Sequence, residues 1–233
     1  MVYAMSDIHG EYDKYKAMLE QIHFSWDDDL YVLGDVIDRG PKPVEVLRDM
    51  SMRGNVFPIL GNHEAVAIHM LEKLLTEMVE ENCNMDVFEE LDRKLRDWRQ
   101  DGGGTTIAGF QSLSKEEKFV LLDYLREFAP YEIVDAGNRR FVLVHAGLQN
   151  FSENRPLHSY GVDELIFDRQ DLSRRYYSDP NTFVVVGHIP TLAITGEAKI
   201  HEENNNICID CGSSMPGGRL ACLCLDTMQA FYV

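Results

Sequence analysis

Five short apolar runs, each followed closely by polar residues, constrain the fold of this 233-residue chain more than any other feature. The runs are rich in β-branched and aromatic residues and are bounded by Gly, Asp or Asn, a pattern typical of buried strands. In open α/β sheets, ligands bind beyond the carboxyl ends of the strands, so five strand ends can supply residues to one site. The expected strands are Val2–Met5, Tyr31–Leu33, Val56–Leu60, Phe141–Val144 and Phe183–Val186.

Helical patterns separate the first three expected strands. Between the first two, Tyr12, Tyr15, Leu19 and Ile22 recur at spacings of three and four and form one helical face. Pro43 can open a second helix, because proline is favoured at the first helical position. The alternation of strand and helix predicts an α/β fold with a largely parallel sheet and right-handed crossovers.

The middle of the chain predicts a helical insertion. Residues 64–99 contain no Pro or Gly and are too many for one ordinary globular helix, so we expect two or more helices that form a cap. A capping box of Ser114 and Glu117 starts a further helix, which ends before Pro130. The "DGGGTT" motif at residues 101–106 breaks the helical run, and its triple glycine at 102–104 either lines the mouth of a site or is a plain flexible loop. We expect a single domain over residues 1–233, with the cap inserted at about 65–130.

The last third of the chain turns mainly to strands. The segment "ICIDCGSSMPGGRLACLCLD", residues 207–226, predicts a hairpin with a wide glycine-containing turn. Cys222 and Cys224 alternate with apolar neighbours, so burial in a strand is favoured over a zinc site. Cys211 and Arg219 are separated by seven residues, whereas a cysteine-phosphatase loop has five, which argues against that chemistry.

Composition excludes several classes of partner. The net charge of −17 disfavours nucleic acid and anionic membranes as partners. No run approaches the roughly 20 apolar residues of a membrane span, and the N-terminal residues show no signal-peptide pattern. The five cysteines are an odd number in a chain too large to need disulfides, so we expect reduced thiols and a cytoplasmic protein. The chain is expected to be a monomer.

The polar residues at the strand ends are metal-ligand types. They combine carboxylate and amide oxygens with imidazoles and include no thiolate, a set that suits Mn, Fe or Zn in a catalytic site. Six groups are too many for one ion that must keep an open position, and about right for two ions that share a carboxylate. The six are Asp7, His9, Asp35, Asn62, His145 and His188.

The motifs "DIHG", "GDVIDRG", "GNHE", "VHAG" and "GH", in this order, resemble the phosphoprotein phosphatase family of dimetal (calcineurin-like) metallophosphoesterases. The resemblance runs from residue 6 to about 225 and is strongest to the compact bacterial or phage-type serine/threonine phosphatases. It implies a two-sheet sandwich flanked by helices, and two divalent metals, with Mn expected first and Fe or Zn as alternatives. It also implies that Asp7, His9 and Asp35 hold one metal, and that Asp35 bridges to a second metal held by Asn62, His145 and His188.

The same resemblance implies catalytic roles. His63 and Asp38 would form a pair in which His63 protonates the leaving oxygen, and Arg39 would hold phosphate. A hydroxide bridging the two metals would attack phosphorus in line, without a phospho-enzyme. Arg169, in "LIFDRQ", would be a second phosphate-binding arginine. The competing interpretation of Arg169 is a member of a solvated charge cluster.

The resemblance leaves the substrate open. The first hypothesis is a phosphatase acting on phosphoserine or phosphothreonine in proteins or peptides, because Asp38 and Glu64 are typical of protein-directed members. The alternative is a symmetrical bis(5'-nucleosyl) tetraphosphate hydrolase acting on dinucleoside polyphosphates. Leu60 favours this alternative, because many protein-directed members have an arginine there. A third hypothesis, a non-enzymatic phosphopeptide-binding module, does not explain why both His63 and Asp38 are present.

Overall fold

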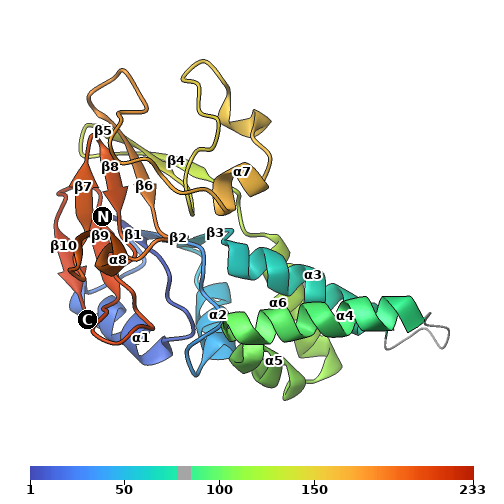
Figure 1. The fold of residues 1–233 in the computed structure, drawn as a ribbon. Coiled ribbons are helices and arrows are strands. Elements are labelled where there is room, and N and C mark those ends of the chain that lie inside the picture. The colour runs from blue at the N-terminus through green and yellow to red at the C-terminus, as the bar shows by residue number, and fades with distance from the viewer. Residues whose placement is uncertain (78–84) are drawn as a thin grey trace.

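The computed structural model describes residues 1–77 and 85–233 as two stacked β-sheets flanked by helices (Figure 1). This confirms the expected α/β class and the two-sheet arrangement. The first sheet has the strand order β10-β9-β1-β2-β3, and its neighbouring strands β1, β2 and β3 are parallel. Its strands are β1 (Val2–Met5), β2 (Asp29–Leu33), β3 (Val56–Ile59), β9 (Ala221–Cys224) and β10 (Ala230–Tyr232).

The second sheet has the order β4-β5-β6-β8-β7. Strands β5, β6 and β8 are parallel, and the edge strands β4 and β7 run antiparallel to their neighbours. The three parallel strands therefore end at one edge of the sheet, as the three parallel strands of the first sheet do. The strands are β4 (Glu132–Ala136), β5 (Arg139–Leu143), β6 (Thr182–Val186), β7 (His201–Glu203) and β8 (Asn206–Cys208).

An apolar layer joins the facing sides of the two sheets. Ala4 and Leu33 from the first sheet lie in one buried cluster with Phe141 and Phe183 from the second. The rings of Phe141 and Phe183 stack with centroids 5.6 Å apart. Alternate residues of β1, such as Met5, belong instead to the core on the helix side of the first sheet. Both faces of these strands are buried, which explains their continuous apolar runs.

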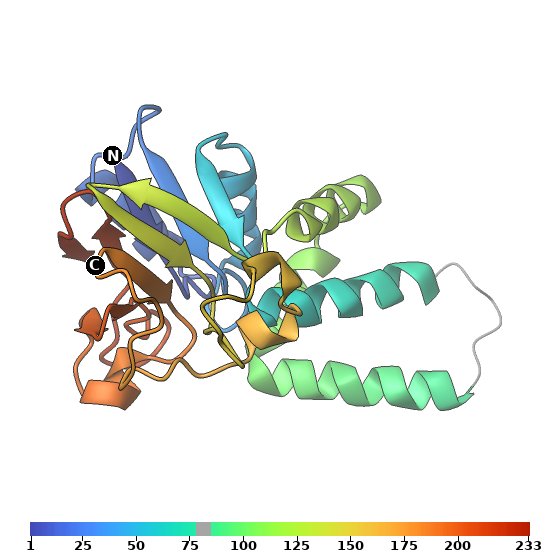
Figure 2. The ribbon, with the colours of Figure 1, turned by 90° about the horizontal axis from the view of Figure 1, so that it is seen from above.

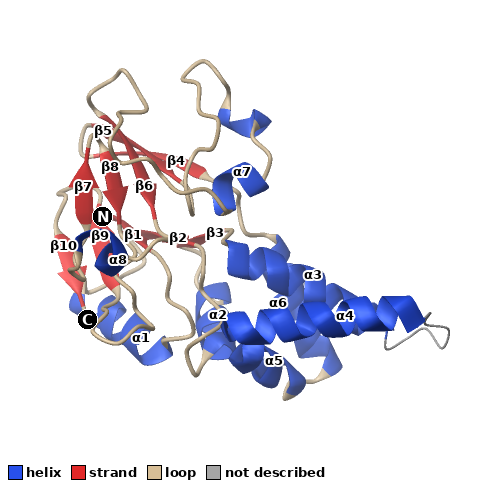
Figure 3. Cartoon of the chain, in the orientation of Figure 1, coloured by secondary structure: helices blue, strands red, loops and turns tan. Residues whose placement is uncertain are grey.

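Helices cover the outer faces of the sheets (Figures 1 and 3). Helices α3 to α6 and the turn η1 gather beside the first sheet, and residues 65–126 are here called the helical insertion. Helices α3 and α4 lie side by side in both views (Figure 2). The described helices are α1 (Tyr12–Gln21), α2 (Pro43–Ser51), α3 (Asn62–Glu77), α4 (Met85–Trp98), α5 (Gly104–Gln111), α6 (Lys115–Arg126), α7 (Asp163–Ile166) and α8 (Thr191–Thr195), with a π-helical turn η1 (Arg99–Gly103) and a 3-10 turn η2 (Leu157–Ser159).

Several local expectations for the insertion are confirmed. Ser114 accepts a hydrogen bond from the backbone of Glu117, whose side chain bonds back, so the capping box starts α6 as expected. The long helical stretch is at least two helices, although its residues 78–84 lie outside the described residues. No helix among the described residues is long and apolar enough to cross a membrane.

The expected hairpin over residues 207–226 is wrong. Strand β8 pairs with β6 and β7 in the second sheet, whereas β9 pairs with β1 and β10 in the first. The glycine-containing segment between them crosses from one sheet to the other. Two neighbouring buried strands show the same alternation whether they pair with each other or with distant strands, so the sequence pattern could not separate these arrangements.

Candidate metal centre and active site

The ends of β1, β2, β3, β5 and β6 bring the expected polar residues to one place. The turns after β1, β2 and β6 are conformationally strained, because site residues in them have a left-handed backbone that non-glycine residues rarely adopt. Such strain is typical of functional sites. Among the described residues, half of the twelve non-glycine residues with positive φ belong to this set: Asp7 (51°), His9 (47°), Asp35 (51°), Asp38 (68°), Arg39 (63°) and His188 (67°).

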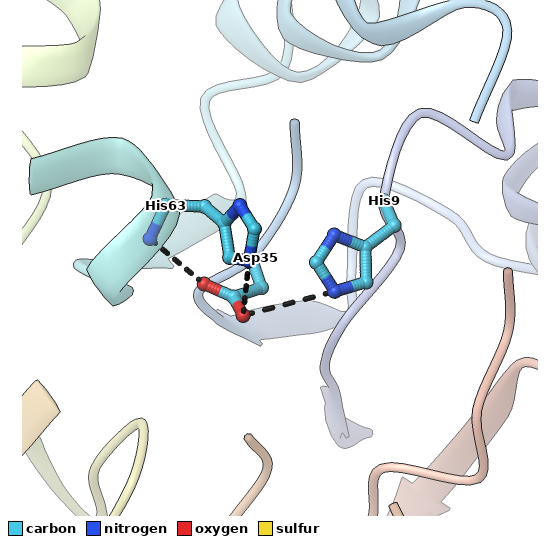
Figure 4. A group of neighbouring side chains, drawn as sticks. All are labelled: His9, Asp35 and His63. Carbon is cyan, nitrogen blue, oxygen red and sulfur yellow. Dashed lines mark hydrogen bonds and ion pairs between the residues drawn. The ribbon is translucent and has the colours of Figure 1, made fainter. Parts of the chain in front are cut away.

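Asp35 lies at the centre of the site (Figure 4). Its Oδ2 is 3.7 Å from Nε2 of His9 and 3.8 Å from Nε2 of His63. Its Oδ1 is 3.4 Å from Nε2 of His145 and accepts a hydrogen bond from the backbone N–H of His63 at 3.2 Å. One carboxylate thus faces imidazoles from three separate segments, as a bridging metal ligand would.

Two groups of candidate metal ligands share this carboxylate. In each, the ligand atoms lie within 4.8 Å of one another: His9, Asp35 and His63 form one group, and Asp35, His145 and His188 form the other. The first differs from the set implied by the resemblance, because it contains His63 where Asp7 was expected. Asp7 lies at the rim of that group, with Oδ1 4.0 Å from Nε2 of His9.

The second group also includes Asn62. Nε2 of His145 is 3.0 Å from Oδ1 of Asn62 and 3.2 Å from Nδ1 of His188. The other ring nitrogens are held by backbone carbonyls: Nδ1 of His145 by Leu33 at 2.7 Å and Nδ1 of His9 by Ile37 at 2.9 Å. Each of these bonds places the ring proton on Nδ1 and leaves Nε2 as a lone pair directed at the site, the usual arrangement of metal-binding histidines.

Asp7 supplies an unpaired buried oxygen. The residue is 1% exposed, and its Oδ2 accepts a hydrogen bond from the backbone of His188 at 3.0 Å. Its Oδ1 has no hydrogen-bond partner. Burial, together with the charges of Asp210 and Asp35, raises the pKa of Asp7 well above its ordinary value. A buried carboxylate with a free oxygen needs a cation or a proton, so Asp7 fits a metal site.

The protonation states of the other candidate ligands also suit metal binding. Burial is the main cause that lowers the pKa values of His9 and His188 to about 4, so both imidazoles are neutral at pH 7. Burial by itself would raise the pKa of Asp35, but the four surrounding histidines lower it, so the carboxylate is ionised. Metal ligands must be deprotonated, so this set of oxygens and neutral imidazoles fits divalent cations.

His63 and Asp38 form a buried hydrogen-bonded pair. Nδ1 of His63 is 2.7 Å from Oδ2 of Asp38. Two residues of the helical insertion also bond to this carboxylate: Trp98 Nε1 donates to Oδ2 at 2.8 Å and Thr106 Oγ1 donates to Oδ1 at 2.5 Å. Burial would lower the pKa of His63, but the Asp38 hydrogen bond and the charges of Asp35 and Asp38 raise it to about 9. This pair therefore has the geometry of an oriented proton donor.

Arg39 lies against the same groups. Its Nη1 is 2.8 Å from Nε2 of His9, and its Nη2 is 3.0 Å from Nε2 of His63. Its backbone N–H donates to the carbonyl of Gly102 at 2.9 Å. The "DGGGTT" motif therefore lines the mouth of the site, the first of the two interpretations of that motif.

Arg169 is the expected site residue for which the structure shows no hydrogen bond or ion pair to the other described site residues. It is exposed, and among the described residues it makes no hydrogen bond or ion pair. Its charge does contribute to lowering the pKa of His188, so it lies on that side of the site. Its role as a second phosphate-binding arginine stays a prediction.

Glu64 has a structural role that the motif pattern did not reveal. Its buried carboxylate accepts hydrogen bonds from the backbone N–H groups of Asp35 at 2.8 Å, Val36 at 2.8 Å and Gly61 at 3.0 Å. It thereby ties the turn after β2 to the start of α3. Burial is the main cause that raises the pKa of Glu64 to about 7. An acidic residue in the first turn of an expected helix was the signal for such a backbone-binding role.

The class of this protein follows from three features: its stacked mixed sheets, its strained strand ends and the carboxylate shared between histidines. Residues 1–212 match the model of the calcineurin-like phosphoesterase family, so the chain belongs to that family. Two curated relatives are symmetrical bis(5'-nucleosyl)-tetraphosphatases. The one from Wigglesworthia glossinidia brevipalpis is 35% identical over 95 residues, and the one from Nitrosococcus oceani is 40% identical over 72 residues. These matches cover 40% and 30% of this chain, and only 35% and 25% of the relatives' own lengths.

Solved structures with the same fold include both substrate classes. A structure provisionally described as a diadenosine tetraphosphatase aligns with a TM-score of 0.66 and 20% identity, over 100% of this chain and 92% of the other. A serine/threonine phosphatase from Saccharomyces cerevisiae aligns with a TM-score of 0.61 and 11% identity, over 95% of this chain and 71% of the other. At these identities the likeness establishes the fold alone.

Proposed function

We propose that this phosphoesterase hydrolyses dinucleoside polyphosphates, with symmetrical cleavage of a bis(5'-nucleosyl) tetraphosphate into two nucleoside diphosphates. The observation that carries the proposal is the 35% to 40% identity to symmetrical tetraphosphatases over 72 to 95 residues. Sequence reasoning ranked phosphoproteins first and this substrate second, and the comparisons favour the second.

A cavity beside His63 supports a nucleoside-containing substrate. It has a volume of about 490 Å³, and its lining combines apolar and aromatic side chains, among them Val66, Trp98 and Phe167, with charged ones. Phe167 is 52% exposed and so is available to stack on a base. Carboxylates in the lining, such as Asp97, can accept hydrogen bonds from a base amino group or from ribose hydroxyls.

We assign the metal-holding role to the strand-end residues. When bound, two divalent cations would supply an activated water and positive charge at the phosphoryl group. Arg39 presents a forked donor next to them and binds non-bridging phosphate oxygens. His63 holds a proton on the side of the cavity and gives it to the leaving oxygen, while Asp38 keeps the imidazole oriented. The set proposed to hold the metals is Asp7, His9, Asp35, Asn62, His145 and His188.

A second candidate substrate is phosphoserine or phosphothreonine, and the His63–Asp38 pair favours it. An alkoxide leaving group needs a proton at the transition state, and His63, with its pKa raised to about 9, is protonated at neutral pH. A nucleoside diphosphate is a far better leaving group and depends less on such a donor.

One assay distinguishes the two candidate substrate classes. The full chain, loaded in turn with Mn²⁺, Fe²⁺ or Zn²⁺, is given diadenosine tetraphosphate or a panel of phosphoserine and phosphothreonine peptides. We expect ADP as the nucleotide product and a kcat/KM at least tenfold above that for any peptide. Asp35→Asn serves as the inactive control. A peptide kcat/KM above that of the dinucleotide would replace the first candidate with the second.

A further inference from the structure

Asp101 places a carboxylate beside Arg39, the proposed phosphate-binding residue, and His63, the proposed proton donor. It lies in the π-helical turn after α4. Its Oδ1 is 3.9 Å from Nη2 of Arg39, and its Oδ2 is 3.7 Å from Nε2 of His63. Both separations exceed hydrogen-bond length, so these are ion-pair contacts that do not fix either side chain.

The backbone next to Asp101 is fixed against Arg39. The carbonyl of Gly102 accepts the backbone N–H of Arg39 at 2.9 Å. Gly102 has φ of 102°, and a Cβ built on it would lie 2.6 Å from Cγ of Arg39. Only glycine permits this approach. The turn therefore holds the backbone of Asp101 beside Arg39, with its carboxylate within reach of the guanidinium.

The Asp101 carboxylate and a bound phosphate group would compete for the positive charge of Arg39. Arg39 is 39% exposed and Asp101 is 63% exposed, so their ion pair is solvated and weak. A dianionic phosphate group offers Arg39 more charge and a bidentate geometry, so it displaces the carboxylate. Because the backbone of Asp101 lies beside Arg39, the carboxylate stays within reach of the guanidinium, and phosphate must compete with it there.

We infer that Asp101 competes with phosphate for Arg39 and thereby weakens the binding of anionic substrates and products. This inference rests on the proposed role of Arg39 in phosphate binding, but not on the identity of the substrate. It gives the helical insertion a role in product release.

The test is inhibition by inorganic phosphate of p-nitrophenyl phosphate hydrolysis by the Mn²⁺-loaded full chain. Asp101→Asn keeps the shape and removes the charge. We expect the phosphate Ki and the KM to fall by about threefold to tenfold. Asp92→Asn is the matched control, because Asp92 is also 63% exposed, lies on α4 and pairs with Arg96. It removes the same charge away from Arg39 and should leave both constants unchanged.

A double variant locates the effect. In an Arg39→Ala background, Asp101→Asn should no longer change the phosphate Ki. An unchanged or raised Ki in Asp101→Asn alone overturns the inference, and a lowered Ki that persists without Arg39 overturns it as well. If Arg39→Ala does not weaken phosphate inhibition, the proposed role of Arg39 fails instead. These outcomes are distinct from a failure to cleave diadenosine tetraphosphate.

Discussion

The strand ends and the helical insertion contribute to the site in different ways. The strand ends supply the candidate metal ligands from five short turns, and several of these turns have strained backbones. The insertion supplies Trp98 and Thr106, which bond to Asp38, and Gly102, which bonds to Arg39. The strand ends therefore supply the candidate metal ligands, and the insertion holds in place the groups proposed to act on phosphate and proton. Variants in the two regions should affect different measured quantities.

The largest expected effect is that of Asp35→Asn, which tests the strand-end region. Asp35 lies in both candidate metal groups, so its loss should weaken both ions. We expect activity to fall by about a thousandfold or more, because several kcal/mol of transition-state stabilisation depend on the metals. Elemental analysis should show fewer than two ions per chain. A variant that retains two ions and full activity would contradict the central position of Asp35.

His63 lies where the two regions meet, and the variant His63→Asn should separate the effect on catalysis from the effect on metal binding. We expect turnover of substrates with poor leaving groups to fall by about a hundredfold to ten-thousandfold, because the proton donor is lost. Metal content should remain at the wild-type level. With p-nitrophenyl phosphate, whose leaving group hardly needs a proton, the loss should be much smaller. Equal losses on good and poor leaving groups would argue against the proton-donor role.

The stability of the metal-free chain should depend on pH through His63. Its folded-state pKa is raised from 6.5 to about 9, so the stabilisation is fully present below about pH 6.5 and is lost as the pH rises to about 9. Urea unfolding should show a loss of about 3 kcal/mol over this range. Glu64 and Asp210, with pKa values of about 7, titrate in His63→Asn as well, and the charge of His63 lowers the pKa of Glu64, so the difference between the two chains reports His63 together with its coupling to Glu64. Parallel pH profiles of the two chains would refute the assignment.

The smallest of these effects tests the insertion alone. Thr106 is fully buried, donates to Oδ1 of Asp38 and accepts its backbone N–H at 3.0 Å. Thr106→Val keeps the volume and removes both bonds, at a cost of about 1–3 kcal/mol in the free energy of unfolding. We expect turnover to fall by about tenfold while metal content is retained. Loss of metal in this variant would mean that the two regions are not separable. Thr105→Val is a suitable control, because Oγ1 of Thr105 has no hydrogen-bond partner.

Local sequence patterns were sufficient to predict most of the strand-end region. Each candidate ligand follows a short apolar run within a few residues, and the carboxyl ends of parallel strands lie together by geometry. The strands at Val2–Met5 and Val56–Ile59 begin at the expected residues, and the helix after Ser114 begins at its capping box. Such features depend on neighbours in sequence, so periodicity and capping residues reveal them.

Contacts between distant segments were not accessible in this way. Trp98 and Thr106 reach Asp38 across 60 and 68 residues, and nothing in their local sequence marks them as its partners. The segment at 207–226 has the alternation of a hairpin, yet its two strands lie in different sheets.

The sequence by itself determined which residue types stand at the strand ends, and hence a set of candidate metal ligands, and the resemblance of its motifs to a known family implied phosphoester chemistry. Only the tertiary structure decided that the strands divide between two sheets, that Glu64 binds the turn after β2, and that the insertion holds Asp38 and Arg39. The physical reason is that strand formation and turn chemistry are local, whereas strand pairing and long-range hydrogen bonds depend on how whole elements pack.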